Sequence, residues 1–165
     1  STLFPYTTLF RSITYDTSGA TLCSSACGYT SLAMVASGLS GNSNINPYSV
    51  IQDIRGIRNG GKTSRGYGAA STSELTSSKY ISRYGIRAIS ITKGGIKSAL
   101  ESGMPVIALV PGHYITLSKS SNGNIVVLDP FANWGDSRGS GEYSSVSHIE
   151  RVYGSISWAA AYREA

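Results

Sequence analysis

Residues 27–35 read Cys27-Gly28-Tyr29-Thr30-Ser31-Leu32-Ala33-Met34-Val35, which places a thiol directly before an apolar segment. Leu32, Val35 and Leu39 recur at helical spacing, and the residues between them are mostly small or apolar. A helix that is apolar on nearly every side is buried in the protein interior. The first turn of a helix also offers unpaired backbone N–H groups and the positive end of the helix dipole, and both favour a thiolate over a thiol. The stretch therefore predicts a buried helix over residues 27–39 with a reactive thiol at its start.

A histidine and an aspartate frame a predicted hairpin farther along the chain. Gly112-His113-Tyr114 opens an alternating, strand-like segment, and Ser121-Asn122-Gly123-Asn124 is a typical hairpin turn into a second strand that ends at Asp129. A hairpin brings the start of its first strand beside the end of its second. We therefore predict that a hydrogen bond joins His113 to Asp129 and fixes the imidazole. With Cys27 approaching from the packed helix, these residues supply the thiol, imidazole and carboxylate that nucleophilic thiol catalysis requires.

These three motifs, in this order, resemble the papain-like peptidases of the C39-like family. Members of that family often read Cys-Gly-Pro-Thr-Ser-Leu-Ala-Met-Val, then Gly-His-Tyr or Gly-His-Phe, then Asp-Pro. The resemblance covers residues 15–130 and implies an α+β domain with the papain-like fold, in which N-terminal helices pack on a C-terminal antiparallel sheet. It also implies a cysteine peptidase that hydrolyses peptide bonds through Cys27, His113 and Asp129 and a thioester acyl-enzyme. Tyr29 departs from the family pattern, which has proline there, and this removes a preset φ angle but no chemistry.

The upstream donor of the oxyanion hole is missing from the pattern. The resemblance implies an oxyanion hole made of the backbone N–H of Cys27 and an upstream side-chain donor, usually glutamine. The sole glutamine of the chain, Gln52, comes after the cysteine. Nearby upstream hydroxyl groups belong to Thr21, Ser24 and Ser25. We therefore expect Cys27 to be alkylated readily while peptides are turned over slowly.

Four other side chains carry chemistry of interest: Cys23, Trp134, His148 and Trp158. Cys23 stands where C39-like members have a small residue, and we expect it to be a bystander. We expect Trp134 and Trp158 to be packing aromatics, with a place in the wall of a substrate cleft as the alternative for Trp134, because it closely follows the Asp-Pro motif. His148 matches no motif and is expected to be a surface or structural residue. The spacing of the two cysteines and two histidines fits no usual zinc site, so we expect neither a metal nor another cofactor.

The rest of the chain predicts an α+β domain with helices first and an antiparallel sheet later. We expect Asn46 to cap a helix, and Ser71 to cap another through a capping box with Glu74, with Gly85 at the end of that second helix. The expected helices cover residues 47–54, 71–84 and 93–101, the expected strands residues 86–91, 106–110, 113–118, 125–128 and about 152–162, and the expected loops residues 56–68 and 135–147.

Composition narrows the range of functions. The 165 residues suit one domain, and a hydrophobic fraction of 41% is sufficient for a core. Only 14% of residues are charged, which is common in exported or cell-surface bacterial proteins. The net charge is +5, but no aromatic interleaving or helix-turn-helix pattern favours nucleic-acid binding, and no apolar run reaches membrane-spanning length. The expected partner is a peptide or cell-wall peptide substrate.

The first twelve residues, Ser1–Ser12, resemble the translation of a short-read sequencing adapter. We expect them to be non-native, so that the single domain runs over residues 13–165 with its own N-terminus truncated and any signal peptide lost. The alternative is an apolar edge strand, because residues 7–10 have fair β propensity.

Two other functions stay open beside the cysteine peptidase. A transglutaminase-like acyl transferase also orders Cys, His and Asp with a short separation between the last two, although the His-Ala-Trp usual around its histidine is absent. The second alternative function is binding alone, by a domain of the same fold that has lost catalysis. The presence of Cys27, His113 and Asp129 argues against such a loss. A live nucleophile reacts with iodoacetamide well below the pH at which a free cysteine reacts, which separates such a binding module from the two enzymes.

Overall fold

The computed structural model describes residues 26–56, 70–130 and 141–165, which form helices on both sides of one antiparallel sheet. Six strands pair in the order β1-β6-β2-β3-β4-β5, so the last strand of the chain lies between β1 and β2. The elements of these residues are α2 (Cys27–Ser40), α3 (Pro47–Arg55), α4 (Thr72–Thr76), α5 (Ser78–Ile81), η1 (Ser82–Tyr84), β1 (Ile86–Ile91), η2 (Lys93–Gly95), α6 (Ile96–Glu101), β2 (Val106–Val110), β3 (His113–Lys119), β4 (Ile125–Leu128), β5 (Gly141–Tyr143), α7 (Val146–Tyr153) and β6 (Trp158–Glu164). Within this part of the chain, no helix has the length and apolar character needed to cross a bilayer.

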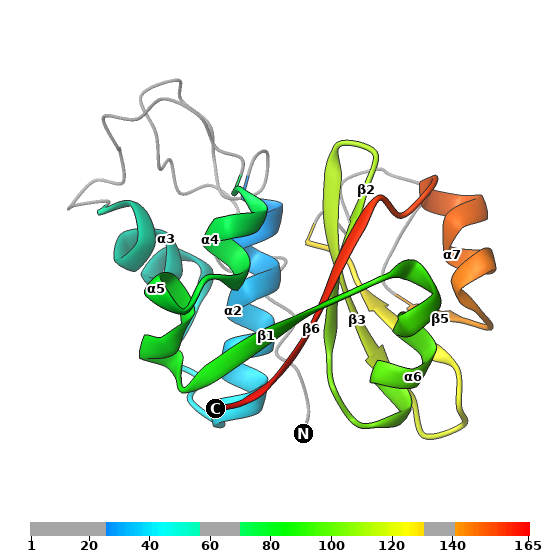
Figure 1. Cartoon of the computed structure of the whole chain (residues 1–165), viewed down its shortest axis with the longest axis horizontal. Helices are drawn as coiled ribbons and strands as arrows, with labels where there is room; N and C mark the ends of the chain where they lie inside the picture. Colours follow the sequence, from blue (N-terminus) through cyan, green and yellow to red (C-terminus); the bar gives the residue numbers. More distant parts are fainter. Residues whose placement is uncertain (1–25, 57–69, 131–140) are drawn as a thin grey trace.

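The sheet separates two hydrophobic layers. Helices α2 to α5 lie on one side of the sheet, and α6 and α7 lie on the other (Figure 1). Strand residues alternate between the layers: Ile107 and Tyr114 belong to the core beneath α2, whereas Ala108 and Ile115 belong to the core beneath α6 and α7. Because both faces are covered, β2 is a continuous apolar run rather than an alternating one.

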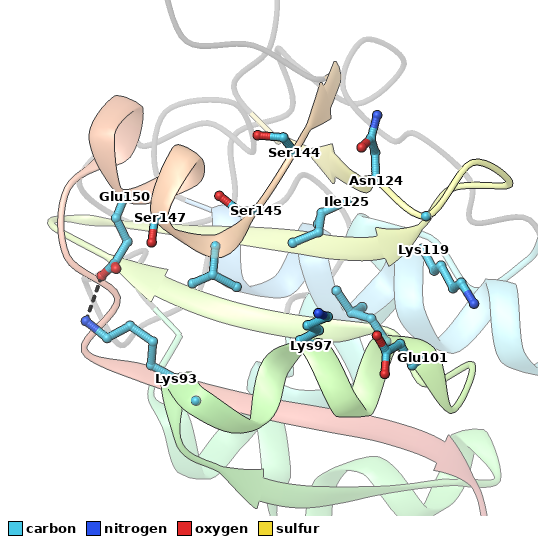
Figure 2. Close-up of a pocket in the computed structure, with 14 residues that line it drawn as sticks. Lys93, Lys97, Glu101, Lys119, Asn124, Ile125, Ser144, Ser145, Ser147 and Glu150 are labelled. Carbon is cyan, nitrogen blue, oxygen red and sulfur yellow. Dashed lines mark hydrogen bonds and ion pairs between the residues drawn. The ribbon is translucent and has the colours of Figure 1, made fainter.

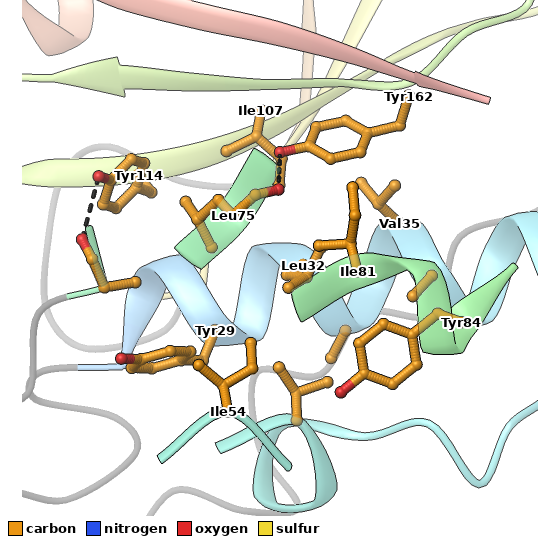
Figure 3. Packing of buried hydrophobic residues seen from close by; sticks show 14 of the residues in the cluster. Tyr29, Leu32, Val35, Ile54, Leu75, Ile81, Tyr84, Ile107, Tyr114 and Tyr162 are labelled. Carbon is orange, nitrogen blue, oxygen red and sulfur yellow. Dashed lines mark hydrogen bonds between the residues drawn. The ribbon is translucent and has the colours of Figure 1, made fainter. Parts of the chain in front are cut away.

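The buried helix predicted from the sequence forms the centre of the first layer. Every residue of α2 from Cys27 to Gly38 is buried. Side chains from α2, α3, α5 and the sheet interlock around it (Figure 3). The hydroxyl of Tyr162 donates to the carbonyl oxygen of Leu75 at 2.8 Å, so a polar group inside this core has a partner.

The caps of α3 and α4 agree with the sequence prediction. The side chain of Asn46 accepts a hydrogen bond from the N–H of Ser49, and the hydroxyl of Ser49 accepts one from the N–H of Asn46, both at 2.9 Å. Ser71 and Glu74 form the corresponding reciprocal pair at the start of α4. These capping boxes satisfy backbone donors that a helix start otherwise leaves unpaired.

The single helix predicted over residues 71–84 is wrong, because the chain forms α4, α5 and the 3₁₀ turn η1 in its place. The break lies at Ser77, whose backbone is extended with φ −68° and ψ 133°. Its hydroxyl accepts a hydrogen bond from the N–H of Lys79 at 3.3 Å and so caps the next helix. Serine and threonine side chains compete with helical hydrogen bonds in this way, and residues 76–78 are Thr-Ser-Ser. Gly85 ends the region as predicted.

The loop predicted over residues 135–147 and the strand predicted around residues 152–162 also require correction. Residues 141–143 form strand β5, residues 146–153 form helix α7, and the last strand begins only at Trp158. Ser145 caps α7 by accepting a hydrogen bond from the N–H of His148 at 3.1 Å. Ile149 and Tyr153, one helical turn apart, are buried. This helix depends on packing of two side chains, whereas the Gly and Ser residues around it favour turns by their local propensity.

Other predictions agree with the structure or lie outside it. The helix predicted over residues 93–101 forms as η2 followed by α6. Residues 1–12, 57–69 and 131–140 lie outside the described residues. The adapter-like segment, most of the loop predicted over residues 56–68 and the domain limits therefore stay predictions.

Candidate active site

Three elements start or end where the candidate residues meet. Helix α2 starts at Cys27, strand β3 starts at His113, and strand β4 ends directly before Asp129. The start of α2 and the turn between β2 and β3 lie at the same end of the molecule (Figure 1). The fold thus brings together a thiol, an imidazole and a carboxylate that are far apart in the sequence.

The hairpin of β3 and β4 holds His113 against Asp129. Thr116 pairs with Leu128, so Asp129 follows the last pair of the ladder. Nε2 of His113 lies 2.6 Å from Oδ1 of Asp129, and both side chains are buried. This hydrogen bond is the contact that the hairpin argument predicts.

The thiol of Cys27 faces the first residues of β3. The backbone N–H of Tyr114 donates to its Sγ atom at 3.5 Å, and the thiol lies close enough to the imidazole of His113 to raise the pKa of that ring. Because Asp129 occupies Nε2 of His113, Nδ1 is the ring nitrogen left for the thiol. Cys27 is not in a disulfide. The imidazole therefore has the carboxylate on Nε2 and leaves Nδ1 for the thiol.

The charge state of His113 follows from competing effects. Burial of the ring lowers its pKa, because a buried imidazolium loses hydration. The hydrogen bonds and charges of Asp129 and Cys27 outweigh burial and raise the pKa of His113 from 6.5 to about 9. The ring is therefore protonated at neutral pH, and its Nε2–H donates to Asp129. An imidazolium beside a thiol favours the thiolate form of the thiol.

A fourth residue, Tyr153, contacts this group and was not predicted from the sequence. Its hydroxyl donates to Oδ2 of Asp129 at 2.7 Å, and its ring stacks on His113 with centroids 6.4 Å apart and planes 22° apart. Tyr153 lies at the end of α7, inside the segment whose secondary structure was predicted wrongly. A correctly placed helix would have shown Tyr153 on the buried face with Ile149, but no sequence spacing indicates contact with Asp129.

The start of α2 lies tightly against β3 because residue 28 is glycine. A Cβ atom at Gly28 would lie 2.6 Å from Cβ of Ala70 and 3.1 Å from the ring of Tyr114. Tyr114 in turn donates its hydroxyl to the carbonyl oxygen of Ala70 at 3.1 Å (Figure 3). Glycine thus permits the close approach that places the thiol of Cys27 against the backbone of β3.

Tyr29, which replaces the proline of the C39-like pattern, links α2 to its neighbours. Its hydroxyl contacts both carboxylate oxygens of Glu74, at 3.1 and 3.2 Å. Nε of Arg55 lies 3.8 Å from the same carboxylate, and its guanidinium lies over the ring of Tyr29 at 5.9 Å. Tyr29 thus links α2 to α4 through its hydroxyl and to α3 through its ring.

Several side chains predicted for the site are outside the described residues. Thr21, Ser24 and Ser25, the candidates for the oxyanion hole, belong to residues 1–25, as does Cys23. Trp134, the candidate for the cleft wall, belongs to residues 131–140. His148 accepts a hydrogen bond from the N–H of Ser144 and its ring packs on Tyr143, while Trp158 packs edge-on against Tyr114. These contacts fit the structural roles expected for His148 and Trp158.

A cavity of about 620 Å³ lies away from these residues, among α6, β4 and the start of α7 (Figure 2). None of the described residues that line it is Cys27, His113 or Asp129. Three lysines and two glutamates surround an apolar floor, and Lys93 pairs with Glu150 at 2.9 Å. The lining residues are Lys93, Gly94, Lys97, Leu100, Glu101, Lys119, Gly123, Asn124, Ile125, Ser144, Ser145, Val146, Ser147 and Glu150.

Solved structures place this architecture among known folds. No protein-family model and no curated protein sequence matches the chain. A Bacillus anthracis protein assigned as a C39-like peptidase aligns over 99% of this chain and 98% of its own, with a TM-score of 0.57 and 14% identity. The fold is that of the C39-like peptidases. A double-glycine-motif protease from an AMS/PCAT transporter, solved in complex with its leader peptide, aligns over 84% of each chain with a TM-score of 0.52 and 16% identity. At these identities the similarity establishes the fold.

Proposed function

We propose that this protein is a cysteine peptidase that hydrolyses peptide bonds with Cys27 as nucleophile, His113 as proton donor and acceptor, and Asp129 as the orienting carboxylate. The observation that carries the proposal is the meeting of three groups at one place: the Cys27 thiol accepts the backbone N–H of Tyr114 directly after His113, and Nε2 of His113 lies 2.6 Å from Oδ1 of Asp129. A nucleophile beside a base that a third group orients is the arrangement common to enzymes that form acyl intermediates. The C39-like peptidase fold supports the same assignment.

The reaction takes place in two stages. The thiolate of Cys27 attacks the carbonyl carbon, so that an S–C bond forms and the carbonyl electron pair moves to the oxygen. Collapse of this intermediate breaks the C–N bond, and the imidazolium of His113 gives its proton to the leaving amine. The neutral imidazole then takes a proton from water, whose oxygen attacks the thioester. The C–S bond breaks, and the thiolate and a carboxylic acid result.

Backbone N–H groups at the start of α2 are suited to hold the oxyanion. Cys27 is the first residue of the helix, and the preceding Ala26 has no side-chain group that can cap it. The first N–H groups of a helix make no hydrogen bond inside the helix and point toward negative charge. The N–H of Cys27 is therefore one donor of the proposed oxyanion hole. Thr21, Ser24 and Ser25 are proposed to supply the other.

A peptide is the proposed substrate class. The transporter protease with the similar fold was solved with a leader peptide bound. A peptide in a protein or in a cell wall has the amide carbonyl that the thiolate requires. The low charged fraction of 14% is common in exported bacterial proteins, and such proteins meet the cell wall. Cell-wall peptides are therefore among the substrates to be tested.

The test is cleavage of three substrates: a peptide library, a leader peptide with a double-glycine motif and purified peptidoglycan. Products are identified by mass spectrometry, and the Cys27→Ala variant serves as the control. Cleavage by the wild type and not by Cys27→Ala supports the proposal. No cleavage of any substrate, or equal cleavage by both proteins, contradicts it.

A competing acyl acceptor separates hydrolysis from acyl transfer. A primary amine added in excess intercepts the thioester of a transglutaminase-like enzyme and forms a new amide. A peptidase gives mainly the free carboxylic acid under the same conditions. A product that is mainly the amide would assign the chain to acyl transferases.

A further inference from the structure

Tyr153 reaches the candidate site from the opposite side of the sheet. Cys27 belongs to the first layer, in α2, whereas Tyr153 is the last residue of α7 in the second layer. We infer that Tyr153 is a positioning residue, which holds the carboxylate of Asp129 in the orientation in which Oδ1 meets His113. The inference rests on the proposed function, because it concerns the orientation of the imidazole in that reaction.

The two oxygens of Asp129 have different partners. Oδ1 lies 2.6 Å from Nε2 of His113, and Oδ2 accepts the hydroxyl hydrogen of Tyr153 at 2.7 Å. A carboxylate bonded at only one oxygen can turn about its Cβ–Cγ bond and keep that bond in several orientations. Bonds at both oxygens leave one orientation, and bonds to an ionised acceptor are short and strong. Tyr153 thereby fixes which oxygen faces the imidazole.

Helix α7 is itself fixed to the turn that leads into His113. Gly154, which follows Tyr153, has a φ of +95°, and a Cβ atom there would lie 2.9 Å from Cγ of Pro111. The N–H of Ser157 donates to the carbonyl oxygen of Leu109 at 2.9 Å. The end of α7 therefore lies directly on the turn between β2 and β3. Its last side chain is placed by the same backbone that places His113.

The hydroxyl of Tyr153 keeps its proton at neutral pH and so stays a hydrogen-bond donor. Burial, the bond to Asp129 and contact with Tyr143 all raise the pKa of Tyr153 above its usual range. The ring of Tyr143 packs against that of Tyr153, with centroids 6.2 Å apart. A tyrosine that keeps its proton and donates it to Asp129 favours the ionised carboxylate, which is the form that pairs with the imidazolium.

Tyr153→Phe tests this inference because it removes the hydroxyl and keeps the ring that stacks on His113. We expect kcat to fall about tenfold with KM unchanged, since misplacement of a catalytic group slows the chemical step. We also expect the pKa of His113, measured by NMR titration, to fall below its wild-type value of about 9. The hydrogen bond to Asp129 is one of the contacts that raise that pKa, and a hydrogen bond weakens when its acceptor turns away.

Tyr84→Phe is the matched control. Tyr84 also donates its hydroxyl to an aspartate, Oδ2 of Asp53, at 2.8 Å, but that aspartate belongs to α3 and not to the proposed catalytic group. We expect this variant to keep wild-type kcat and the wild-type pKa of His113. His148→Asn assigns the titrating signals, because the chain has two histidines.

The outcomes separate this inference from the proposed function. A pKa of His113 that is unchanged or raised in Tyr153→Phe overturns the positioning role, whatever the activity. The same loss of kcat in Tyr84→Phe also overturns it, because the effect would then come from destabilisation. Failure of the wild type to cleave any peptide contradicts the proposed function, and the titration still reports on Tyr153.

Discussion

Nε2 of His113 and Oδ1 of Asp129 lie 2.6 Å apart with the two side chains 3% and 1% exposed. The pairs Arg83–Asp53 and Lys93–Glu150 are 20% to 48% exposed. The pair Arg55–Glu74 lies between these and the His113–Asp129 pair, at 12% and 14% exposed and 3.8 Å apart. Exposed pairs are screened by water and contribute little, whereas one partner of a buried pair cannot be removed without leaving a charge in an apolar environment. The His113–Asp129 pair is therefore the contact whose removal has the clearest consequences.

Asp129→Asn should move the alkaline limit of activity to lower pH. Below about 9 the wild-type His113 carries the proton that the leaving amine takes in the proposed reaction, and above that pH the proton is lost. Asparagine removes the charge and weakens the hydrogen bond that raise the pKa, so the limit should shift toward the ordinary histidine value of 6.5. The pH dependence of kcat/KM measures this shift. An alkaline limit that stays near 9 in the variant would show that Asp129 does not set the protonation of His113.

Stability should depend on pH through the same histidine. The pKa of His113 is about 9 in the folded protein and 6.5 in the unfolded chain, so the folded state binds the proton more tightly. This contribution is complete below about 6.5 and is lost as the pH rises through about 9. Urea denaturation should therefore give a larger free energy of unfolding at pH 6 than at pH 9.5. His113→Gln should reduce that difference, and an equal difference in both proteins would refute the assignment.

Cys27→Ala should abolish turnover and keep the fold, whereas Cys23→Ala should be nearly silent. His113→Ala should cost about as much activity as Cys27→Ala, because members of one catalytic unit are not additive. Rates on the best peptide substrate, with circular dichroism as the check on folding, measure both effects. Alkylation by iodoacetamide at mildly acidic pH should label Cys27 and should slow in His113→Ala, because the variant lacks the imidazolium that favours the thiolate. Undiminished activity in Cys27→Ala would exclude this mechanism.

The parts of the fold that the sequence predicts well are those that local chemistry determines. The helix after Cys27 follows from apolar residues at helical spacing, the start of α3 from Asn46 and Pro47, and the pairing of His113 with Asp129 from a short hairpin. In each case the residues that decide the structure are close in the sequence.

The parts that the sequence misses depend on contacts between distant residues. Helix α7 is stabilised by burying Ile149 and Tyr153 in a layer completed by α6 and the sheet, and its Ser and Gly neighbours favour a loop. Tyr153 and Asp129 are 24 residues apart, and Tyr29 and Glu74 are 45 apart. No periodicity or cap links such pairs, so the support behind Asp129 becomes visible only in three dimensions.

Deletion of residues 1–12 should change the free energy of unfolding by no more than about 0.5 kcal/mol, the usual range for surface changes without a specific role. Ser1–Ser12 resembles a translated adapter, and a segment of that origin would not have been selected to pack against the rest of the protein. Thermal unfolding of the full chain and the shortened chain measures the difference. A loss of several kcal/mol would show that the segment is a strand of the native protein.

Gly28→Ala should lower activity more than it lowers stability. The new Cβ atom would lie 2.6 Å from Cβ of Ala70, a distance at which the backbone must shift, and 3.1 Å from the ring of Tyr114. Because Gly28 follows Cys27 directly, the shift moves Sγ away from the N–H of Tyr114 and from His113. Misplacement of a reacting atom by about 1 Å can cost on the order of 10² in rate, so we expect kcat/KM to fall by about that factor.

The matched change for this prediction is Gly141→Ala, where nothing lies within 4 Å of the new Cβ atom and the φ angle is not in the left-handed region. That variant should keep wild-type kinetics. Alanine also favours helices over glycine by about 1 kcal/mol, so Gly28→Ala would be stabilising if the start of α2 had free space around it. Steady-state kinetics and thermal unfolding of the two variants show whether a Cβ atom at residue 28 clashes with its neighbours or finds free space. Wild-type kcat/KM together with a raised Tm in Gly28→Ala would mean that the close approach of α2 to β3 is not needed to place the thiol.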